Sequence, residues 1–432
     1  MKETLRRLFL AALEELSLDR VIPSRIRVEG PVLAVDGERI ELDPFKKIIL
    51  VALGKAGVPM ARAVQALLEP RLASGVVVSP EEVETPPRYM LHYRGGHPYP
   101  NAESVRAAEV ILELLRGLKQ SHLVIYLLSG GGSAIVEKPI HRSIGLHDLG
   151  EFYRLLVTCG AGIVEMNILR KHLSATKGGR MAEVADPARQ LTLYVSDVPA
   201  GRASTVASGP TMPDESTLED CRRIVERWQL GERLPASIRA LFEGGALPET
   251  PKPGHPKFRR SSWHALLSNE HGLEKLAAAG HALGWIVERD LSVDDWPVVD
   301  AAERLLARLE GFRQAHPGRA VALLSGGELS SPVTGDGRGG RNQAFALACA
   351  TRIAGENIAV LSGGTDGIDG NSPACGAVAD GETIARAERL GLQADPFYRR
   401  SDSYGFFSRL DDAVMTGPTG NNIRDLRMLV AW

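Results

Sequence analysis

The same local pattern occurs three times in this chain: a run of apolar residues, a glycine-rich loop, and then a helical pattern. The three segments are Lys47–Leu53 with Gly54–Gly57, Leu123–Leu128 with Ser129–Ser133, and Ala320–Leu324 with Ser325–Glu328. A continuous apolar run of strand length is typical of a strand buried on both faces, and the helix that follows covers one of them. The pattern therefore predicts an α/β fold with parallel, helix-covered sheets.

The length of the chain indicates two domains. A chain of 432 residues exceeds what one hydrophobic core usually serves. The stretch Glu243–Arg260 contains four prolines and three glycines, a composition typical of a linker or a long surface crossing. We therefore expect an N-terminal domain over residues 1–245 and a smaller α/β domain over residues 260–432.

Helical periodicity gives further elements. At the start of the chain Leu5, Phe9, Leu13 and Leu16 form one apolar stripe, which predicts an amphipathic surface helix rather than a signal peptide. The other expected helices are Ala102–Leu115, Leu149–Val184, Leu218–Trp228, Gly272–Leu283, Val299–Gln314, Asn342–Ala354 and Gly381–Leu390.

The charge balance and the cysteines limit the kinds of molecule that this protein is expected to bind. The chain has 51 basic and 53 acidic side chains, so no bulk positive field collects nucleic acid or an anionic membrane. The four cysteines contain no CxxC pair, and no apolar run is long enough to span a bilayer. We expect a soluble cytoplasmic protein with small-molecule partners, no nucleic acid and no membrane, and a homodimer is left open.

The loop Ser129-Gly130-Gly131-Gly132-Ser133 directly follows an apolar strand, so its amides can converge on an anion. The alternative is a tight turn without ligand, because the loop matches neither standard nucleotide-binding motif. Lys55 stands at the carboxyl end of another strand, where open parallel sheets bind ligands. Its alternative is a solvated lysine at a loop tip.

Polar side chains interrupt the helical segment that follows. Asn167 and Lys171 are four residues apart on one face, and Lys177 comes after them, which indicates a polar site wall. For Arg170 and Arg180 a charged outer face is an equal alternative.

Carboxylates follow two other strands. Asp197 ends the strand Gln190–Val195, and Asp366 and Asp369 follow Asn357–Leu361. Strand-end carboxylates can hold magnesium on a phosphoryl group or accept a hydroxyl proton. Asp-Gly steps are also common in turns, and for Asp369 that interpretation is equally good.

Arg341 opens a helix after Gly339-Gly340, where a cation is unfavourable unless an anion compensates it. Its guanidinium fork is suited to a carboxylate or phosphate. The loop Thr416–Asn422, which contains Thr419, is small enough to approach a ligand closely, or it is a C-terminal turn.

Taken together, these segments resemble the class II glycerate kinases, the glycerate 2-kinases of the MOFRL family. The resemblance rests on ten motifs in order along the chain: Val51–Gly57, Gly95–Asn101, Ser129–Ala134, Asn167–Ser174, Lys177–Gly179, Ala207–Thr211, Ser325–Glu328, Gly339–Gln343, Gly364–Gly370 and Thr416–Asn422. One departure is Ser196–Arg202, where relatives commonly read SerAspValxGlyAsp and this chain, with Ala200, lacks the second acid.

The resemblance implies a Rossmann-like N-terminal domain with a parallel sheet, a smaller MOFRL-type α/β domain, and an active site in the cleft between them. It also implies transfer of the γ-phosphoryl group of ATP to the 2-hydroxyl of D-glycerate with Mg²⁺ or another divalent cation. We expect Lys55, Arg341 and Asp197 to be catalytic and Asp197 and Asp366 to bind metal. The residues expected to bind nucleotide or substrate are Ser129, Gly130, Gly131, Gly132, Ser133, Asn167, Lys171, Lys177, Glu328, Asn342, Asp366 and Thr419. An Arg341→Lys substitution is expected to lower activity without affecting folding.

Two other functions compete with this one. Relatives have carried the label hydroxypyruvate reductase, but a nicotinamide enzyme should show a GxGxxG loop and an acid after the next strand, and neither is evident after Leu53 or Leu128. A non-enzymatic protein that binds phosphorylated metabolites would use similar loops without needing Lys55, Asp197, Arg341 and Asp366 to act together.

Overall fold

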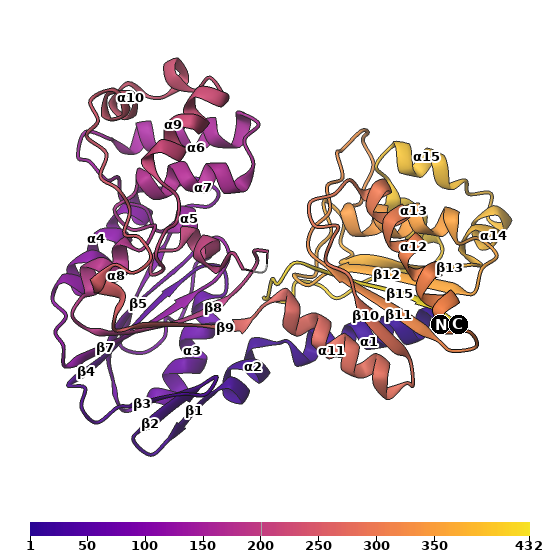
Figure 1. The fold of residues 1–432 in the computed structure, drawn as a ribbon, viewed down its shortest axis with the longest axis horizontal. Coiled ribbons are helices and arrows are strands. Elements are labelled where there is room, and N and C mark those ends of the chain that lie inside the picture. Colours follow the sequence, from indigo (N-terminus) through magenta and orange to yellow (C-terminus); the bar gives the residue numbers. More distant parts are fainter. Residues whose placement is uncertain (200) are drawn as a thin grey trace. The chain divides into compact units, whose positions relative to one another are not determined.

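The computed structural model describes residues 1–199 and 201–432, and it divides into two compact units. The N-terminal unit is Leu18–Leu266, and the C-terminal unit combines Met1–Ser17 with Leu267–Trp432 (Figure 1). Ala200, which belongs to the departure noted in the loop after Val195, lies outside the described residues.

The central sheet of the N-terminal unit has the strand order β6-β5-β4-β7-β8-β9. Its strands are β4 (Lys47–Leu53), β5 (Leu72–Ser79), β6 (Met90–Arg94), β7 (His122–Leu128), β8 (Arg189–Val195) and β9 (Ser261–Leu267). The pairs β5/β6, β4/β5, β4/β7 and β7/β8 are all parallel. Renumbered from the first strand, this order is 3-2-1-4-5-6, the order of a Rossmann sheet, which confirms the expected fold class.

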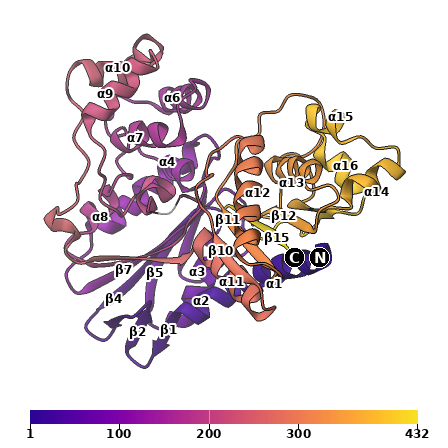
Figure 2. The ribbon, with the colours of Figure 1, turned by 45° about the vertical axis from the view of Figure 1, so that its right-hand side comes forward.

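Helices cover both faces of this sheet, as the unbroken burial of β4 after Lys47 and of all of β7 requires. The core on one face packs Ile49, Val51 and Leu53 against α4 (Ala102–Arg116) and α8 (Arg180–Ala185). On the other face lies α3 (Gly57–Leu68), with α2 (Leu18–Arg25) beside it (Figure 2). A small antiparallel sheet is formed by β1 (Ile26–Glu29), β2 (Val32–Val35) and β3 (Glu38–Glu41).

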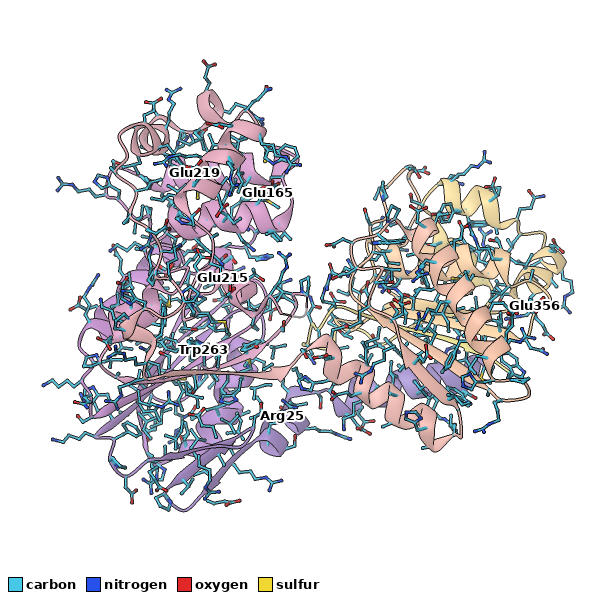
Figure 3. The ribbon with its side chains drawn as sticks, in the orientation of Figure 1. Arg25, Glu165, Glu215, Glu219, Trp263 and Glu356 are labelled. Atoms are coloured by element: carbon cyan, nitrogen blue, oxygen red, sulfur yellow. The ribbon has the colours of Figure 1, made fainter. Side chains whose placement is uncertain are left out.

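A second hydrophobic core of the N-terminal unit is entirely helical. It is built by α6 (Leu146–Thr158), α7 (Ile163–His172), α9 (Leu218–Arg227) and α10 (Ala236–Glu243), and Figure 3 labels Glu165 and Glu219 on it. The single helix expected over Leu149–Val184 is wrong. The chain instead forms α6, α7 and α8. Gly160, with positive φ, follows the end of α6, while α7 ends at His172 and the positive-φ pair Gly178-Gly179 lies directly before α8, a conformation that glycine adopts readily.

Short helical elements connect these parts. They are α5 (Gly132–Ile135) and the 3₁₀ helices Ala203–Ser208, Gly231–Arg233 and Pro256–Phe258.

The C-terminal unit has a mixed sheet of order β10-β11-β15-β12-β13-β14. The strands are β10 (Ile286–Arg289), β11 (Val321–Gly326), β12 (Ile358–Gly364), β13 (Gly376–Asp380), β14 (Ala413–Val414) and β15 (Asp425–Ala431). Only β10 and β11 are parallel, since β15 returns between β11 and β12 and is antiparallel to both. The expectation of a parallel sheet around Ala320–Leu324 is therefore wrong for this unit. The last strand of the chain, β15, lies between β11 and β12 and runs antiparallel to both, so these two strands are not direct neighbours.

Helices also sandwich this sheet. One core joins α12 (Val298–Ala315) and α13 (Arg341–Arg352) to β11, β12 and β15. Smaller helices, α14 (Thr383–Arg389), α15 (Ala394–Arg399) and α16 (Ser403–Arg409), pack around α13. The opposite face is covered by α11 (Asn269–Ala282) and by α1 (Lys2–Glu15).

The position of α1 differs from the predicted domain boundaries, which placed it in the N-terminal domain. Leu5 and Phe9 are fully buried, and a Cβ on Gly363 of β12 would lie 2.6 Å from Phe9 Cζ. Lys2 Nζ also pairs with Asp412 Oδ1 at 3.0 Å. The apolar stripe that predicts an amphipathic helix therefore finds its partner surface at the far end of the sequence.

Candidate functional site

Two loops meet at the carboxyl ends of β4 and β7, the neighbouring strands where the order of the N-terminal sheet reverses. The Lys55 amide donates to Gly130 O (2.9 Å), and the Ala56 amide donates to Ser129 Oγ (3.0 Å). A Cβ on Gly54, whose φ is +122°, would lie 2.2 Å from Ser129 Oγ, so only glycine allows this contact. Ligands of open α/β sheets bind at this switch point, so Lys55 and the Ser129–Ser133 loop together form a candidate anion site.

The backbone of this loop is available to a ligand. In residues 1–199 and 201–432, the amides of Gly130, Gly131 and Gly132 donate no hydrogen bond to another protein group. Gly131 adopts a φ of +83°, in the left-handed region, which turns successive amides towards one point. Lys55 itself is exposed. The loop thus offers backbone donors and a cation to the same ligand.

Two further side chains lie against the loop. A Cβ on Gly130 would fall 2.1 Å from Asp197 Oδ2, and one on Gly131 would lie 3.2 Å from Lys55 Cγ and 3.6 Å from His97 Cδ2. Asp197 follows β8 and His97 follows β6, so strands on both sides of the switch point contribute. Burial and then the charge of Lys55 lower the pKa of His97, which favours a neutral imidazole at neutral pH.

At the end of the Ser129–Ser133 loop, Ser133 begins a row of hydrogen-bonded polar side chains. Ser133 Oγ lies 2.8 Å from Ser208 Oγ, which donates to Asn167 Oδ1 (3.2 Å). Ala207 and Ser208 both have positive φ (50° and 60°), a strained conformation for residues with a side chain. Ser133 and Asn167, both predicted from sequence, are thereby brought together.

The two predicted lysines are engaged within the protein. Lys171 Nζ donates to Asp214 Oδ1 (3.0 Å), and Lys177 Nζ donates to Glu137 Oε2 (2.5 Å). Lys171 is 4% exposed and Lys177 is 1% exposed. Both ammonium groups are therefore buried and neutralised by carboxylates of the protein.

In the C-terminal unit, Arg341 also faces carboxylates of the protein. Its Nε and Nη2 donate to Asp425 Oδ2 (2.6 Å) and Oδ1 (2.9 Å), and Nη2 lies 3.1 Å from Glu328 Oε1. Burial lowers the pKa of Arg341, but the Asp425 hydrogen bonds outweigh this and raise it. The anion that compensates a cation at this helix start is thus supplied by the protein, and Nη1 remains for a ligand.

A second layer of ion pairs holds this arrangement. Arg427, fully buried on β15, donates to Gly326 O (3.1 Å), Gly327 O (2.9 Å) and Asp425 Oδ2 (3.2 Å). Arg424 Nη1 and Nη2 donate to Asp294 (2.7 and 2.6 Å), which accepts from the Glu328 amide (3.0 Å). The loop after β11 is fixed by these pairs, so Glu328 is held beside Arg341.

The start of α13 is capped by Asp369. Its carboxylate accepts from the amides of Asn342 (3.1 Å) and Gln343 (2.9 Å) and from Gln343 Nε2 (3.0 Å). Asn342 is 1% exposed and accepts from Ser362 Oγ (2.5 Å). The amides expected beside Arg341 are therefore already satisfied, and Asn342 lies in the interior.

The ionisation of Asp369 gives a testable pH dependence. Burial raises its pKa to about 6, although the hydrogen bonds from α13 lower it. Because the pKa in the folded state exceeds that of an unfolded aspartate, about 3.9, this group adds stability below about pH 4 that is lost as the pH rises through about 6.

We expect the difference in unfolding free energy between wild type and Asp369→Asn, which cannot titrate, to shift by about 2–3 kcal/mol in favour of wild type between pH 7 and pH 4. Urea unfolding of both proteins across this range measures it. A difference that does not change with pH would contradict the raised pKa.

The remaining predicted residues of this unit lie in its loops. Asp366 Oδ1 accepts from the Ile368 amide (3.2 Å), and a Cβ on Gly364 would lie 3.1 Å from Asp366 Oδ1 and 3.5 Å from Asp425 Oδ1. Thr419 Oγ1 donates to Thr365 O (2.6 Å), so its hydroxyl shapes the loop. Asp366 and Asp425 therefore lie at the same edge of the sheet as Arg341.

Membrane-spanning helices and clusters of metal-ligating side chains are both absent from the described residues. No helix there is long and apolar enough to cross a membrane. No group of three or more His, Cys, Asp or Glu side chains is placed to hold a metal ion among them.

A doubly wound sheet with glycine-rich loops at its switch point defines an α/β protein of the nucleotide- and phosphate-binding class. Family models agree in detail: residues 4–243 match the domain of unknown function DUF4147, and residues 321–425 match the MOFRL family.

Individual proteins are similar over nearly the full length. The D-glycerate 2-kinase of Thermotoga maritima is 32% identical, covering 98% of each chain, and a putative hydroxypyruvate reductase of Agrobacterium vitis is 36% identical, covering 96% of this chain and 93% of the other. The crystal structure of glycerate kinase from Thermotoga maritima matches with a TM-score of 0.85 at 30% identity, covering 100% of this chain and 99% of the other. The chain belongs to the MOFRL family of glycerate 2-kinases, which confirms the resemblance seen in the sequence.

Several residues of the site escaped the sequence prediction. In the N-terminal unit they are His97 and Ser208, and in the C-terminal unit they are Asp294, Asp425 and Arg427. His97 and Ser208 lie within motifs that were recognised but not assigned a role. For Asp425 and Arg427 a signal existed, because two charged residues at alternate positions open an otherwise apolar strand, DLRMLVA.

Proposed function

We propose that this chain is a kinase that transfers the γ-phosphoryl group of ATP to the 2-hydroxyl of D-glycerate. The observation that carries the proposal is the joint placement of Lys55, Asp197 and the free amides of Gly130–Gly132 at the switch point. Phosphoryl transfer needs positioning and neutralisation of charge on the transferred group, and this set of donors supplies both. The cytoplasmic location and the oligomeric state stay predictions.

Space for a nucleoside lies beside Lys55. A hollow of about 390 Å³ beside Lys55 is lined by Arg62, Ser79, Glu81 and Glu82 among others. Glu81 and Glu82 follow the second strand of the Rossmann order, the place from which acidic residues accept hydrogen bonds from a ribose in such sheets. We assign the nucleoside to this hollow and the phosphates to Lys55 and the glycine loop.

The roles follow from charge. Lys55 neutralises the transferred phosphoryl group, and the loop amides hold its oxygens. Arg341 is assigned to an anionic group of the substrates through Nη1, with Asp425 and Glu328 fixing its fork. Asp366 is assigned to the edge of the cluster formed by Arg341, Asp425 and Glu328, because it lies beside Asp425 near Gly364.

A divalent cation fits the carboxylate on the loop. Asp197 lies directly against Gly130, and Mg²⁺ is commonly bound by one or two carboxylates together with substrate phosphates rather than by an all-protein cage. When bound, the ion would neutralise charge on the phosphates. Asp197 would hold it, since Ser196–Arg202 offers no second acid.

We therefore predict that activity depends on a divalent cation and that Asp197→Asn raises the Mg²⁺ concentration needed for half-maximal activity, while lowering kcat by about tenfold or more. Steady-state rates over a Mg²⁺ titration, with excess EDTA as the zero point, measure both. Full turnover in EDTA would remove the cation from the reaction, and an unchanged Asp197→Asn titration would remove Asp197 from its binding.

The second candidate is the reductase named among the relatives. The presence of Glu81 and Glu82 after β5 weakens one of the two grounds given against it, since an acid does follow the second strand. The other ground remains, because Gly54-Lys55-Ala56-Gly57 lacks the GxGxxG spacing and places a lysine in the loop.

One experiment separates the candidates. The protein is incubated with ATP, Mg²⁺ and D-glycerate, and separately with NADH or NADPH and hydroxypyruvate. Formation of ADP together with 2-phosphoglycerate, identified by phosphorus NMR, supports the kinase. Oxidation of the nicotinamide without ADP formation would replace it with the reductase, and binding of D-glycerate or ATP without either reaction would indicate a binding protein.

A further inference from the structure

Arg170 is a buried cation without a counterion. It lies on α7, is 9% exposed, and its Nε is sealed from solvent without any hydrogen-bond partner. Its contacts are Asn167 Oδ1, 3.5 Å from Nη1, and the ring of Tyr153, whose centroid is 4.7 Å from Arg170 Cζ. Burying a charge without an opposite charge is unfavourable, so the residue needs an explanation.

The neighbouring buried cations have more partners. Lys171 pairs with Asp214 and Lys177 with Glu137. Arg180, 7% exposed, donates to Glu249 O (3.3 Å) and Pro248 O (3.0 Å), although its Nε, like that of Arg170, has no hydrogen-bond partner among the described residues. Across residues 1–199 and 201–432, no carboxylate comes within ion-pair distance of Arg170. Arg170 therefore has the weakest compensation of these four buried cations, with one amide oxygen at 3.5 Å and an aromatic ring.

This charge is connected to the glycine loop. Asn167 Oδ1, which faces Arg170 Nη1, also accepts from Ser208 Oγ, and Ser208 Oγ meets Ser133 Oγ at 2.8 Å. Tyr153, on which the guanidinium stacks, has its hydroxyl between two acceptors for its one proton, Glu137 Oε2 (2.6 Å) and Ser133 O (3.0 Å). Asn167 and Tyr153, which contact the guanidinium of Arg170, are thus also linked to Ser133 at the end of the glycine loop.

We propose that Arg170, with Asn167, Ser208 and Ser133, binds the carboxylate of the small hydroxy acid that accepts the phosphoryl group. The site has what such a ligand requires: a preorganised fork for a planar carboxylate, two hydroxyls for its own hydroxyl groups, and an unmatched positive charge. This inference rests on the proposed function, since it names the acceptor site of that reaction.

The test uses Arg170→Met, which keeps the length of the side chain and removes its charge. We expect the melting temperature without ligand to be unchanged or higher, because the unpaired buried charge is gone. We expect KM for D-glycerate to rise about tenfold or more, and the stabilisation of the protein by D-glycerate in thermal-shift measurements to be lost. Stabilisation by ATP should stay, and Arg170→Lys should lie between the two.

Arg180→Met is the matched control, because that arginine is similarly buried but donates to two carbonyl groups; it should lower the melting temperature and keep the D-glycerate shift. A fall in melting temperature for Arg170→Met with both ligand shifts intact would show a structural role and overturn the proposal. Loss of the ATP shift alone would also overturn it, since the charge would then serve a nucleotide phosphate. Because thermal shift needs no turnover, a protein that binds D-glycerate through Arg170 but forms no ADP would reject the kinase reaction and leave the binding site standing.

Discussion

Replacing Lys55 by alanine is expected to lower kcat/KM for D-glycerate about 100- to 1,000-fold, the usual effect of removing one preorganised electrostatic donor. Lys55 is exposed at the switch point, its amide bonds Gly130 O, and its side chain lies over Gly131. These contacts direct the ammonium group to the place where the loop amides are free. Steady-state kinetics with ATP and D-glycerate measure the loss.

Lys47→Ala is the matched control, because Lys47 is exposed at the opposite end of β4, the strand that precedes Lys55. It should leave kcat/KM within about twofold, as expected for a surface substitution away from the site. The melting temperature of both variants should stay near that of wild type, since neither ammonium group is buried. A Lys55→Ala enzyme with wild-type kinetics would move the phosphate site away from the β4 loop.

For Arg341→Lys we expect two effects together. A lysine cannot reproduce the paired donation of Nε and Nη2 to Asp425, so kcat/KM should fall by about tenfold or more. Asp425 is fully buried and would lose a hydrogen bond from a charged donor, which typically costs about 1–3 kcal/mol of stability. The expectation from sequence that folding is unaffected does not take this pair into account.

Arg352→Lys, at the other end of α13, is the control, because that arginine is exposed and donates only to Ala348 O (2.8 Å). Thermal unfolding and kinetics of both variants separate the two effects. An Arg341→Lys protein with full activity and lowered stability would confine the arginine to a structural role. The reverse result, lost activity at unchanged stability, would show that Asp425 tolerates a single donor.

The sequence alone predicts the parts of the protein whose signal is local. Apolar runs such as Lys47–Leu53 identify strands buried on both faces, and glycine patterns such as Ser129–Ser133 identify loops that a side chain would block. The stripe of Leu5 and Phe9 likewise predicts the helix α1, because helical periodicity needs no knowledge of the partner surface. The order of the motifs along the chain was sufficient to identify the family.

Only the tertiary structure decides which groups meet. Three cationic residues, Arg170, Lys171 and Lys177, are close together in the sequence. The two lysines have buried carboxylate partners from distant segments, whereas Arg170 contacts an aromatic ring and has no carboxylate partner within the described part of the chain. In the same way α1 packs on β12, and Lys2 pairs with Asp412 across 410 positions. Arg341 pairs with Asp425 across 84 positions. The free energy of a buried charge depends on what surrounds it in space, and single-sequence patterns report only the neighbours along the chain.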